Sequence, residues 1–452
     1  MMNCLGVVAE YNPFHNGHAW HLSEARRITG AEGVICVMSG DFLQRGEPAV
    51  MSKWARTEAA LHCGADLVIQ IPVFYSTGSA DIFAHGAITL LSATGVVTDI
   101  CFGSETGSLE TLQDNLDRLF EDAGIQDRIQ QAIREGLPYP RAMSMALDGN
   151  LDHHSPNDIL GLEYLRALRK MGSSMKPWTI IRAEAGYGDQ QLPESGSIAS
   201  ATSIRAAMMD AFLNGADAFP DGADAIAKVV TPFVPEIMAS LIRTEAIDGR
   251  CPVGWKDFAS QVLTRFRSMI PDEVSAHRGV GTVLGRKLLK ASWANGTVRE
   301  MAESVRSRNV TWSRIYRAIA AVLLGISTPA ADLLARRPGY GRVLGFNEKG
   351  KAILAAMRER ATLPFINSPD RAWPSYNRWV SRSREPFEPR EPIQWPGMNR
   401  PFPDEAAFAA DLQADRKASG IWSAALANPG DRSKAGESRK PVMISTGLVK
   451  GN

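Results

Sequence analysis

The sequence is poor in the features that mark membrane, secreted and metal-binding proteins. Only five of its 452 residues are cysteine, and they are scattered, without a C-x-x-C pair or another metal-ligand spacing. They are typical of small buried thiols in a reducing cytoplasm. No apolar run approaches the roughly 18 to 20 residues that a membrane helix needs, and the chain enters a predicted strand without a signal peptide. We expect a cytoplasmic protein with no membrane partner and no protein-bound metal.

A strong overall charge is also missing, because 50 Lys and Arg residues face 49 Asp and Glu residues. This balance hides an asymmetry: residues 241–360 hold about 21 Lys/Arg against about 10 Asp/Glu. Such a surplus is the electrostatic footprint of nucleic-acid contact, and the alternative is a helical domain with a solvated basic face. The length allows two or three domains, and we find no internal repeat.

The chain opens with a predicted strand, turn and helix. Residues 5–9 form a short apolar run typical of a buried strand, and Asn12-Pro13 breaks it. The helix then begins around His15-Asn16-Gly17-His18. A helix N-terminus attracts phosphate, a glycine allows close approach of a ligand, and imidazoles at i and i+3 can donate to a polyphosphate. His15 and His18 are therefore the candidate catalytic residues, and the alternative is a histidine-rich helix start without a ligand.

Strands and helices alternate over the first half of the chain. Strands are predicted at residues 5–9, 33–39, 66–71, 97–102 and 176–183. This order predicts an α/β fold with a Rossmann-like, doubly wound parallel sheet, whose ligands bind at the carboxyl ends of the strands. Beyond Pro220 the periodicity is helical nearly throughout. We expect a catalytic domain at 1–218, a mainly helical domain at 219–425 and a disordered tail at 426–452.

Polar residues follow two of the predicted strands. The loop at 39–49 offers Gln44, Arg45 and Glu47 to a small polar substrate or a phosphate, unless it is an ordinary surface loop. Gly103 lies at the end of the fourth strand, where the backbone could pass close to an adenine or ribose. The alternative for Gly103 is a plain turn.

Three helix or strand ends add further candidates. Asn157 lies in the first turn of a helix capped by Ser155, where it can read a ribose or base edge or act as a second cap. Arg182 ends the strand at 176–183 and suits a phosphate. Ser203 and Arg205 stand at the start of another helix and form a second candidate anion-binding end.

A basic, aromatic helix is predicted at residues 310–325. Trp312 and Tyr316 interleave with its arginines, a combination that can stack on nucleotides and pair with phosphates. Aromatics spaced i and i+4 also pack commonly in cores, and that alternative stays open. The candidate tRNA contacts are Arg306, Arg308, Arg314 and Arg317.

Six stretches in order resemble the tRNA(Met) cytidine acetate ligase family, which carries the H-x-G-H signature of nucleotidyltransferases and class I aminoacyl-tRNA synthetases. The resemblance covers about residues 3–425. It lies in the segments 10–18, 39–49, 102–105, 155–165, 200–205 and 342–350.

The resemblance implies a reaction in two steps. ATP and acetate form acetyl-adenylate and pyrophosphate, with Mg²⁺ as the expected ion. The N4 amine of the wobble cytidine of elongator tRNA(Met) then takes the acetyl group and AMP leaves. The family's ATP-binding residues map onto Gly103, Asn157, Arg182 and one continuous segment: Val8, Ala9, Glu10, Tyr11, Asn12, Pro13, Phe14, His15, Asn16, Gly17, His18, Ala19, Trp20 and His21.

The sequence departs from the family at two places. Gly188 stands where family members often have a histidine, and the Pro/Arg-rich stretch at 367–402 is longer than usual. Two other functions share parts of the pattern. One is an adenylyltransferase for a small phosphate-bearing cofactor precursor, although such enzymes tend to be much shorter. The other is a non-catalytic RNA-binding protein that retains a nucleotide fold.

Overall fold

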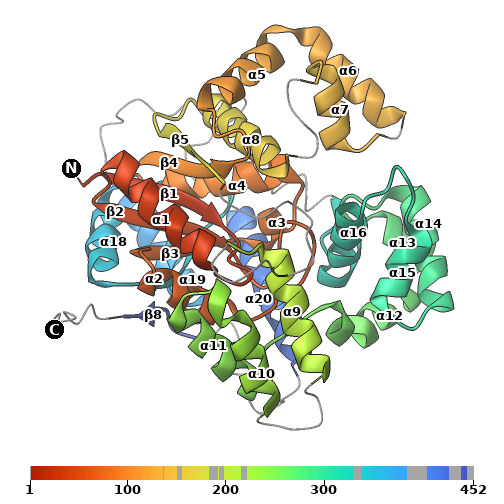
Figure 1. Ribbon diagram of the computed structural model, residues 1–452. Coiled ribbons are helices and arrows are strands. Elements are labelled where there is room, and N and C mark those ends of the chain that lie inside the picture. The colour runs from red at the N-terminus through yellow and green to blue at the C-terminus, as the bar shows by residue number, and fades with distance from the viewer. Residues whose placement is uncertain are drawn as a thin grey trace.

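The computed structural model describes residues 2–135, 137–149, 155–182, 192, 198–214, 221–328, 337–383, 405–426 and 439–444. An eight-stranded sheet crosses the molecule in the order β5-β4-β1-β2-β3-β6-β7, and β8 pairs with β6 (Figure 1). The strands are β1 (Cys4–Ala9), β2 (Gly33–Ser39), β3 (Leu67–Ile71), β4 (Val97–Ser104), β5 (Lys176–Ile181), β6 (Gly341–Phe346), β7 (Phe365–Ile366) and β8 (Val442–Met443).

The central strands are buried on both faces. Every residue of β2 and β3 is buried, without the alternation that a half-exposed strand would show. This is the pattern of a parallel sheet covered by helices on each side. Strands β1 to β5 pair in parallel, whereas β6 runs antiparallel to β3. The predicted α/β fold with a Rossmann-like, mainly parallel sheet is confirmed.

The strand order places a crevice beside β1. From β1 the chain proceeds on one side to β2 and β3, and later on the other side to β4 and β5. The connections therefore leave the carboxyl ends of β1 and β4 in opposite directions. In open α/β sheets this switch point is where ligands bind.

Helices cover the sheet and extend beyond it. The first half contributes α1 (Asn16–Thr29), α2 (Lys53–His62), α3 (Val73–Ser76), α4 (Ala80–Ala93), α5 (Leu109–Glu121), α6 (Ala123–Arg134), α7 (Tyr139–Ala146), α8 (Pro156–Lys170) and α9 (Ala201–Asn214). The second half contributes α10 (Asp221–Val230), η1 (Thr231–Phe233), α11 (Glu236–Ile247), η2 (Trp255–Phe258), α12 (Ala259–Arg267), α13 (Pro271–Ser275), α14 (Gly281–Ala294), α15 (Val298–Val305), α16 (Trp312–Leu324), α18 (Glu348–Arg360), η3 (Pro369–Arg371), α19 (Ala372–Ser383) and α20 (Glu405–Ala424). Among the residues that the structure describes, no helix is long and apolar enough to cross a membrane.

The predicted helical region at 219–425 is interrupted. Helices α12 to α16 form a separate helical unit, residues 255–328, but the chain then returns to the sheet through β6 and α18 (Figure 1). Strand β6 pairs with β3, whose outer edge would otherwise leave backbone groups without partners. Hydrophobic periodicity does not reveal which distant strand covers an edge, so the pairing of β6 with β3 was not predicted.

One expectation for the C-terminal part needs correction. The predicted disordered tail at 426–452 contains β8, which pairs with β6 through Gly345 and Val442, so the prediction is wrong for those residues. The stretch at 367–402 begins with η3 and α19, and its residues 384–402 lie outside the described part of the chain. Gly188 also lies outside it.

Candidate active site

The turn after β1 carries two imidazoles that are fixed by the backbone of the same turn. His15 is the N-cap of α1, and its Nδ1 accepts a hydrogen bond from the Gly17 N–H at 3.1 Å. Nδ1 of His18 accepts in turn from the His15 N–H at 3.2 Å. The two rings stack with their centroids 3.6 Å apart. This is a capping box in which imidazoles replace the usual hydroxyl and carboxylate.

These hydrogen bonds define the protonation state of both rings. Burial, reinforced by the charge of Arg182, lowers the pKa of His15 to about 3 and that of His18 well below its usual range. The rings are therefore neutral at pH 7. A neutral ring whose Nδ1 accepts a hydrogen bond carries its proton on Nε2. The turn thus holds two uncharged Nε2–H donors in a fixed orientation, as the sequence predicted for contact with a polyphosphate.

His21, one turn further along α1, has the same electrostatic character. Burial and then the charge of Arg182 lower its pKa to about 4. Its Nε2 is buried and has no hydrogen-bond partner among the described residues. A buried polar atom without a partner is costly unless a ligand or water satisfies it, so this nitrogen has a hydrogen bond left to make with a ligand or water.

Arg182 lies near the histidine turn, since its charge contributes to the lowered pKa of all three histidines. It follows β5, and its N–H donates to the carbonyl of Ser104 at the end of β4 with a length of 3.0 Å. Its guanidinium donates to Oδ1 of Asn157 at 2.9 Å. A Cβ on Gly103 would lie 3.1 Å from the Arg182 side chain, so the glycine gives that side chain room to cross the strand end. Gly103, Asn157 and Arg182 therefore meet as predicted.

The N-terminus of α8 is not open to an anion. The carboxylate of Glu105 accepts from the N–H groups of Asn157 and Asp158, at 3.1 and 2.8 Å. It also accepts from Nδ2 of Asn157 at 2.6 Å, while Ser155 makes no side-chain cap. Glu105, which follows β4, thus accepts from the free N–H groups at the start of α8. Its negative charge is also favourable beside the positive end of the helix dipole. Asn157 is consequently a fixed link between Glu105 and Arg182.

The loop after β2 completes the site. The Glu10 carboxylate accepts from the Gln44 N–H at 2.7 Å, which ties the loop at 39–49 to the histidine turn. Arg205 of α9 donates to the Asn12 carbonyl at 2.8 Å and lies 3.8 Å from the Glu47 carboxylate. Burial raises the pKa of Glu10, and the N–H of Gln44 and the charges of Arg45 and Arg205 oppose that rise. Gln44, Arg45, Glu47 and Arg205 thus belong to one polar cluster.

A family model described as HIGH Nucleotidyl Transferase matches residues 2–387 of the chain. The tRNA(Met) cytidine acetate ligase of Acetivibrio thermocellus is 38% identical over 376 residues, which are 81% of this chain and 88% of that protein. The protein of the same name from Halothermothrix orenii is 35% identical over 382 residues, 81% of this chain and 87% of that protein. The chain belongs to this family. The predicted resemblance is confirmed.

Solved structures of the family superpose closely on the whole chain. TmcAL from Thermotoga maritima in its apo form I has a TM-score of 0.85 at 32% identity, with 98% of this chain and 100% of that chain covered. The same protein bound with alpha-thio ATP, in form II, gives a TM-score of 0.83 at 31% identity, with the same coverage. An ATP analogue therefore binds to a family member that shares this fold.

Within this family site, Ser203 has a structural role instead of the predicted anion contact. It is buried at 1% exposure. Its N–H donates to Oγ of Ser200 at 3.1 Å, and its own hydroxyl donates to the Ser200 carbonyl at 2.9 Å. The Ser203 N–H at the start of α9 is thus already satisfied by Ser200. Arg205, two positions further along α9, is the residue of this pair that faces the polar cluster.

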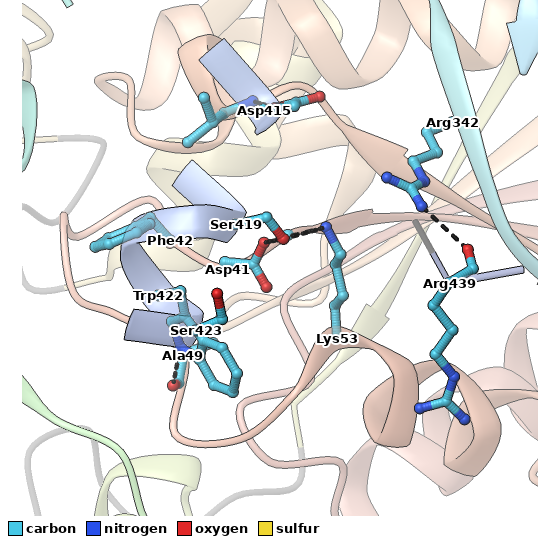
Figure 2. A network of polar contacts seen from close by, with 12 residues as sticks. Asp41, Phe42, Ala49, Lys53, Arg342, Asp415, Ser419, Trp422, Ser423 and Arg439 are labelled. Atoms are coloured by element: carbon cyan, nitrogen blue, oxygen red, sulfur yellow. Dashed lines mark hydrogen bonds and ion pairs between the residues drawn. The ribbon is translucent and has the colours of Figure 1, made fainter. Parts of the chain in front are cut away.

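Helix α20 holds both ends of the loop at 39–49 (Figure 2). Oγ of Ser419 donates to the Asp41 carboxylate at 2.8 Å, and the Trp422 indole N–H donates to the Ala49 carbonyl at 3.1 Å. Lys53 forms a fully buried ion pair with Asp41 at 3.1 Å. The sequence did not identify the two residues of α20, because their contacts reach across more than 370 positions and leave no local pattern.

A second buried cation joins the ends of two strands. Arg56 of α2 donates to the carbonyls of Glu10 and Ser39, at 2.6 and 3.1 Å, and also to the Gly40 carbonyl. It thereby fixes the loops that leave β1 and β2. The sequence signal that could have identified Arg56 is an arginine among the apolar residues of the predicted helix, because a charge buried there must find partners.

The tip of the loop at 39–49 lies against the helical unit. A Cβ on Gly46, whose φ is +83°, would lie 2.3 Å from the backbone N of Arg317 in α16. This close approach requires a glycine. The loop that borders the active site is thus in backbone contact with the helix that carries the predicted RNA-binding residues.

The aromatic residues of α16 extend into a stack. Tyr316 lies between Trp312 and Trp255, with ring centroids 5.7 and 5.8 Å apart and nearly parallel planes. The guanidinium of Arg306 lies 5.0 Å from the Trp312 ring. Arg308 and Arg314 are exposed, whereas burial lowers the pKa of the half-buried Arg317 to about 10. The rings are partly buried, so they serve the packing of the unit and still have an accessible edge.

Proposed function

We propose that the protein is an ATP-dependent ligase that activates acetate as acetyl-adenylate and transfers the acetyl group to a tRNA. The acceptor is N4 of the wobble cytidine of elongator tRNA(Met), and the products are N4-acetylcytidine, AMP and pyrophosphate. The curated relatives carry the name of this activity, and a family member binds an ATP analogue. The observation that carries the proposal is the pair of Nε2–H donors on His15 and His18, at the sheet's switch point, near Arg182.

The first step needs donors for a charge that grows on phosphate. A carboxylate oxygen of acetate attacks the α-phosphorus, the bond from the α-phosphorus to the α,β-bridging oxygen breaks, and pyrophosphate leaves with both electrons of that bond. His15 and His18 stabilise the departing oxygens as neutral donors, and Arg182 supplies the positive charge. Because the donors are held by the backbone before the substrate binds, little reorganisation is needed during the reaction.

The second step uses the adenylate as a leaving group. The N4 amine attacks the acyl carbon, the C–O bond to AMP breaks, and the amine loses its proton. The cluster of Gln44, Arg45, Glu47 and Arg205 lies beside the histidine turn and can contact the acetate or a phosphate. The helical unit, in contact with this loop through Gly46, is the part that we assign to the tRNA.

Mg²⁺ has no evident protein ligands at the site. The described residues contain no group of three or more His, Cys, Asp or Glu side chains that could hold a metal ion. The Glu105 and Asp158 carboxylates are occupied by backbone donors, and Glu10 accepts from Gln44. These residues do not fit a resident magnesium site, and we assign no step to the ion. We place the enzyme in the cytoplasm, where its five free cysteines would stay reduced.

The test is a labelling experiment with total tRNA. We expect incubation with ATP and labelled acetate, followed by digestion of the RNA, to give one labelled nucleoside that comigrates with N4-acetylcytidine. Omission of ATP should abolish the label, and purified elongator tRNA(Met) should accept it where initiator tRNA does not.

The same protein preparation distinguishes the other functions. Pyrophosphate release with nicotinamide mononucleotide or phosphopantetheine, and none with acetate, would replace the proposal by a cofactor adenylyltransferase. Tight binding of tRNA with no pyrophosphate release from any carboxylate would replace it by a non-catalytic RNA-binding protein.

A further inference from the structure

Helix α14 has one buried face and one fully exposed face. Leu284, Leu288 and Ala291 point into the helical unit. The outward residues recur three or four positions apart and are Val283, Arg286, Lys287, Lys290 and Trp293. At 100° per residue they fall within an arc of roughly 120°. The exposed face is therefore a narrow stripe of three cations between two large apolar side chains.

The three cations form no ion pair with an acid in the part of the chain that the structure describes. Helix α14 contains no Asp or Glu. Within the part of the chain that the structure describes, no ion pair or hydrogen bond is recorded for the side chains of Arg286, Lys287 or Lys290. On the adjacent helix α13, the Glu273 carboxylate accepts a hydrogen bond from the Ile270 N–H at 3.0 Å and does not pair with a cation of α14. An uncompensated group of three cations on one helix face is an electrostatic site for a polyanion.

Trp293 ends the stripe in an orientation suited to stacking. It is 66% exposed, and the guanidinium of Arg267 lies 5.5 Å from its ring. Arg267 is held in place because its Nε donates to the Ser292 carbonyl at 2.8 Å. An exposed indole beside a fixed guanidinium can contact a base or ribose in any sequence, since every base has a π-face.

The position of α14 indicates a large ligand. In Figure 1 it lies at the outer edge of the helical unit, whereas α16 lies on the side of the sheet and contacts the active-site loop. A molecule that reaches both must extend across the unit. Membrane insertion does not fit, because a helix that lies in a membrane surface buries its apolar face in lipid and the apolar face of α14 packs in the protein core.

The geometry points to the outward face of α14 as a contact surface for the sugar-phosphate backbone of the tRNA, remote from the reacting cytidine. Arg286, Lys287 and Lys290 pair with phosphates, and Trp293 packs against a ribose or an unpaired base. This inference rests on the proposed function for the identity of the RNA. It adds a second contact region beyond the arginines around α16, and it assigns affinity and not base recognition to that region.

The test compares two triple variants of the full-length enzyme with equal loss of charge. The first is Arg286→Gln, Lys287→Gln and Lys290→Gln on α14. The control is Lys349→Gln, Lys351→Gln and Arg358→Gln on α18, which are exposed and lie on the opposite side of the molecule (Figure 1). The dissociation constant of unmodified tRNA is measured at several salt concentrations, together with tRNA acetylation and tRNA-independent ATP–pyrophosphate exchange with acetate.

We expect the α14 variant to bind tRNA about 10- to 100-fold more weakly at low salt. The slope of log K against log salt should fall by about 2 to 3, since each phosphate contact contributes roughly 0.9. Exchange should stay at the wild-type rate, and the α18 variant should change affinity less than twofold. Trp293→Ala should weaken binding further, and Trp293→Phe should restore most of that loss.

Three results would overturn the inference. The first is an unchanged salt slope in the α14 variant, and the second is an equal loss of tRNA affinity in both triple variants. The third is an α14 variant that loses binding to phosphatidylglycerol vesicles but keeps its tRNA affinity. A wild-type enzyme that binds tRNA through this face but acetylates none would support the inference and contradict the proposed function.

Discussion

The histidine turn and the loop at 39–49 border the same site but are fixed in different ways. In the turn, each imidazole is held by a backbone N–H two or three positions away. The loop is held at both ends by Ser419 and Trp422 of α20, near the other end of the chain. The groups assigned to phosphate chemistry are thus placed locally, and those beside the small substrate depend on the complete fold.

The largest effect should come from a change that keeps the turn but removes a donor. His15→Asn retains an N-cap oxygen for the Gly17 N–H and loses the Nε2–H group. We expect the rate of acetyl-adenylate formation, followed by ATP–pyrophosphate exchange, to fall about 10²- to 10³-fold. The exposed His62→Asn serves as the control. Near wild-type exchange in the His15 variant would contradict the role assigned to the turn.

A smaller effect is expected at Arg182. Arg182→Lys keeps the charge but cannot reproduce the planar contact with Asn157. Loss of a charge-assisted hydrogen bond at this position should lower kcat/KM for ATP about 10- to 100-fold in the exchange assay. Arg166→Lys, on α8 beside Glu163, is the matched change outside the crevice. Equal losses in both variants would show that the effect is not specific to the site.

Acid should destabilise the folded protein through the buried His15. The pKa of His15 is lowered to about 3 in the folded protein, whereas an unfolded histidine titrates near 6.5. Below pH 6.5 the unfolded state therefore takes up a proton that the folded state does not, and stability falls as the pH falls. Between pH 7 and pH 5 the wild type should lose about 2 kcal/mol more than His15→Asn in urea unfolding. Parallel pH curves for the two proteins would rule out a buried neutral His15.

The smallest effect should come from the remote support of the loop. Trp422→Phe leaves the Ala49 carbonyl buried without its donor, which should cost about 1–3 kcal/mol of stability. The loop should shift only slightly, so we expect KM for acetate to rise about 3- to 10-fold, well below the loss from a 1 Å misplacement of reacting groups. Trp379→Phe, whose indole donates to the Ala361 carbonyl, is the control. A full loss of exchange in Trp422→Phe would mean that the loop contributes chemistry, and not only position.

The same contrast explains what could be predicted from the sequence. Strand β2 at Gly33–Ser39 and the start of α1 were predicted closely, because apolar runs, Asn12-Pro13 and His15 are local signals. The meeting of Gly103, Asn157 and Arg182 was implied by the family resemblance, because the family's ATP contacts map onto all three residues. Four features were not predicted. They are the capping of α8 by Glu105, the hydrogen bonds of Ser203 to Ser200, the pairing of β6 with β3, and the hydrogen bonds from α20 to the loop at 39–49. Each depends on a partner chosen by the tertiary fold, which periodicity does not encode.

The most direct test of the account is a crystal structure of this protein with an ATP analogue. We predict phosphate oxygens within about 2.7–3.2 Å of Nε2 of His15 and His18, and the guanidinium of Arg182 on the same phosphates. A nucleotide bound elsewhere, with no phosphate oxygen at these two nitrogens, would contradict the central claim.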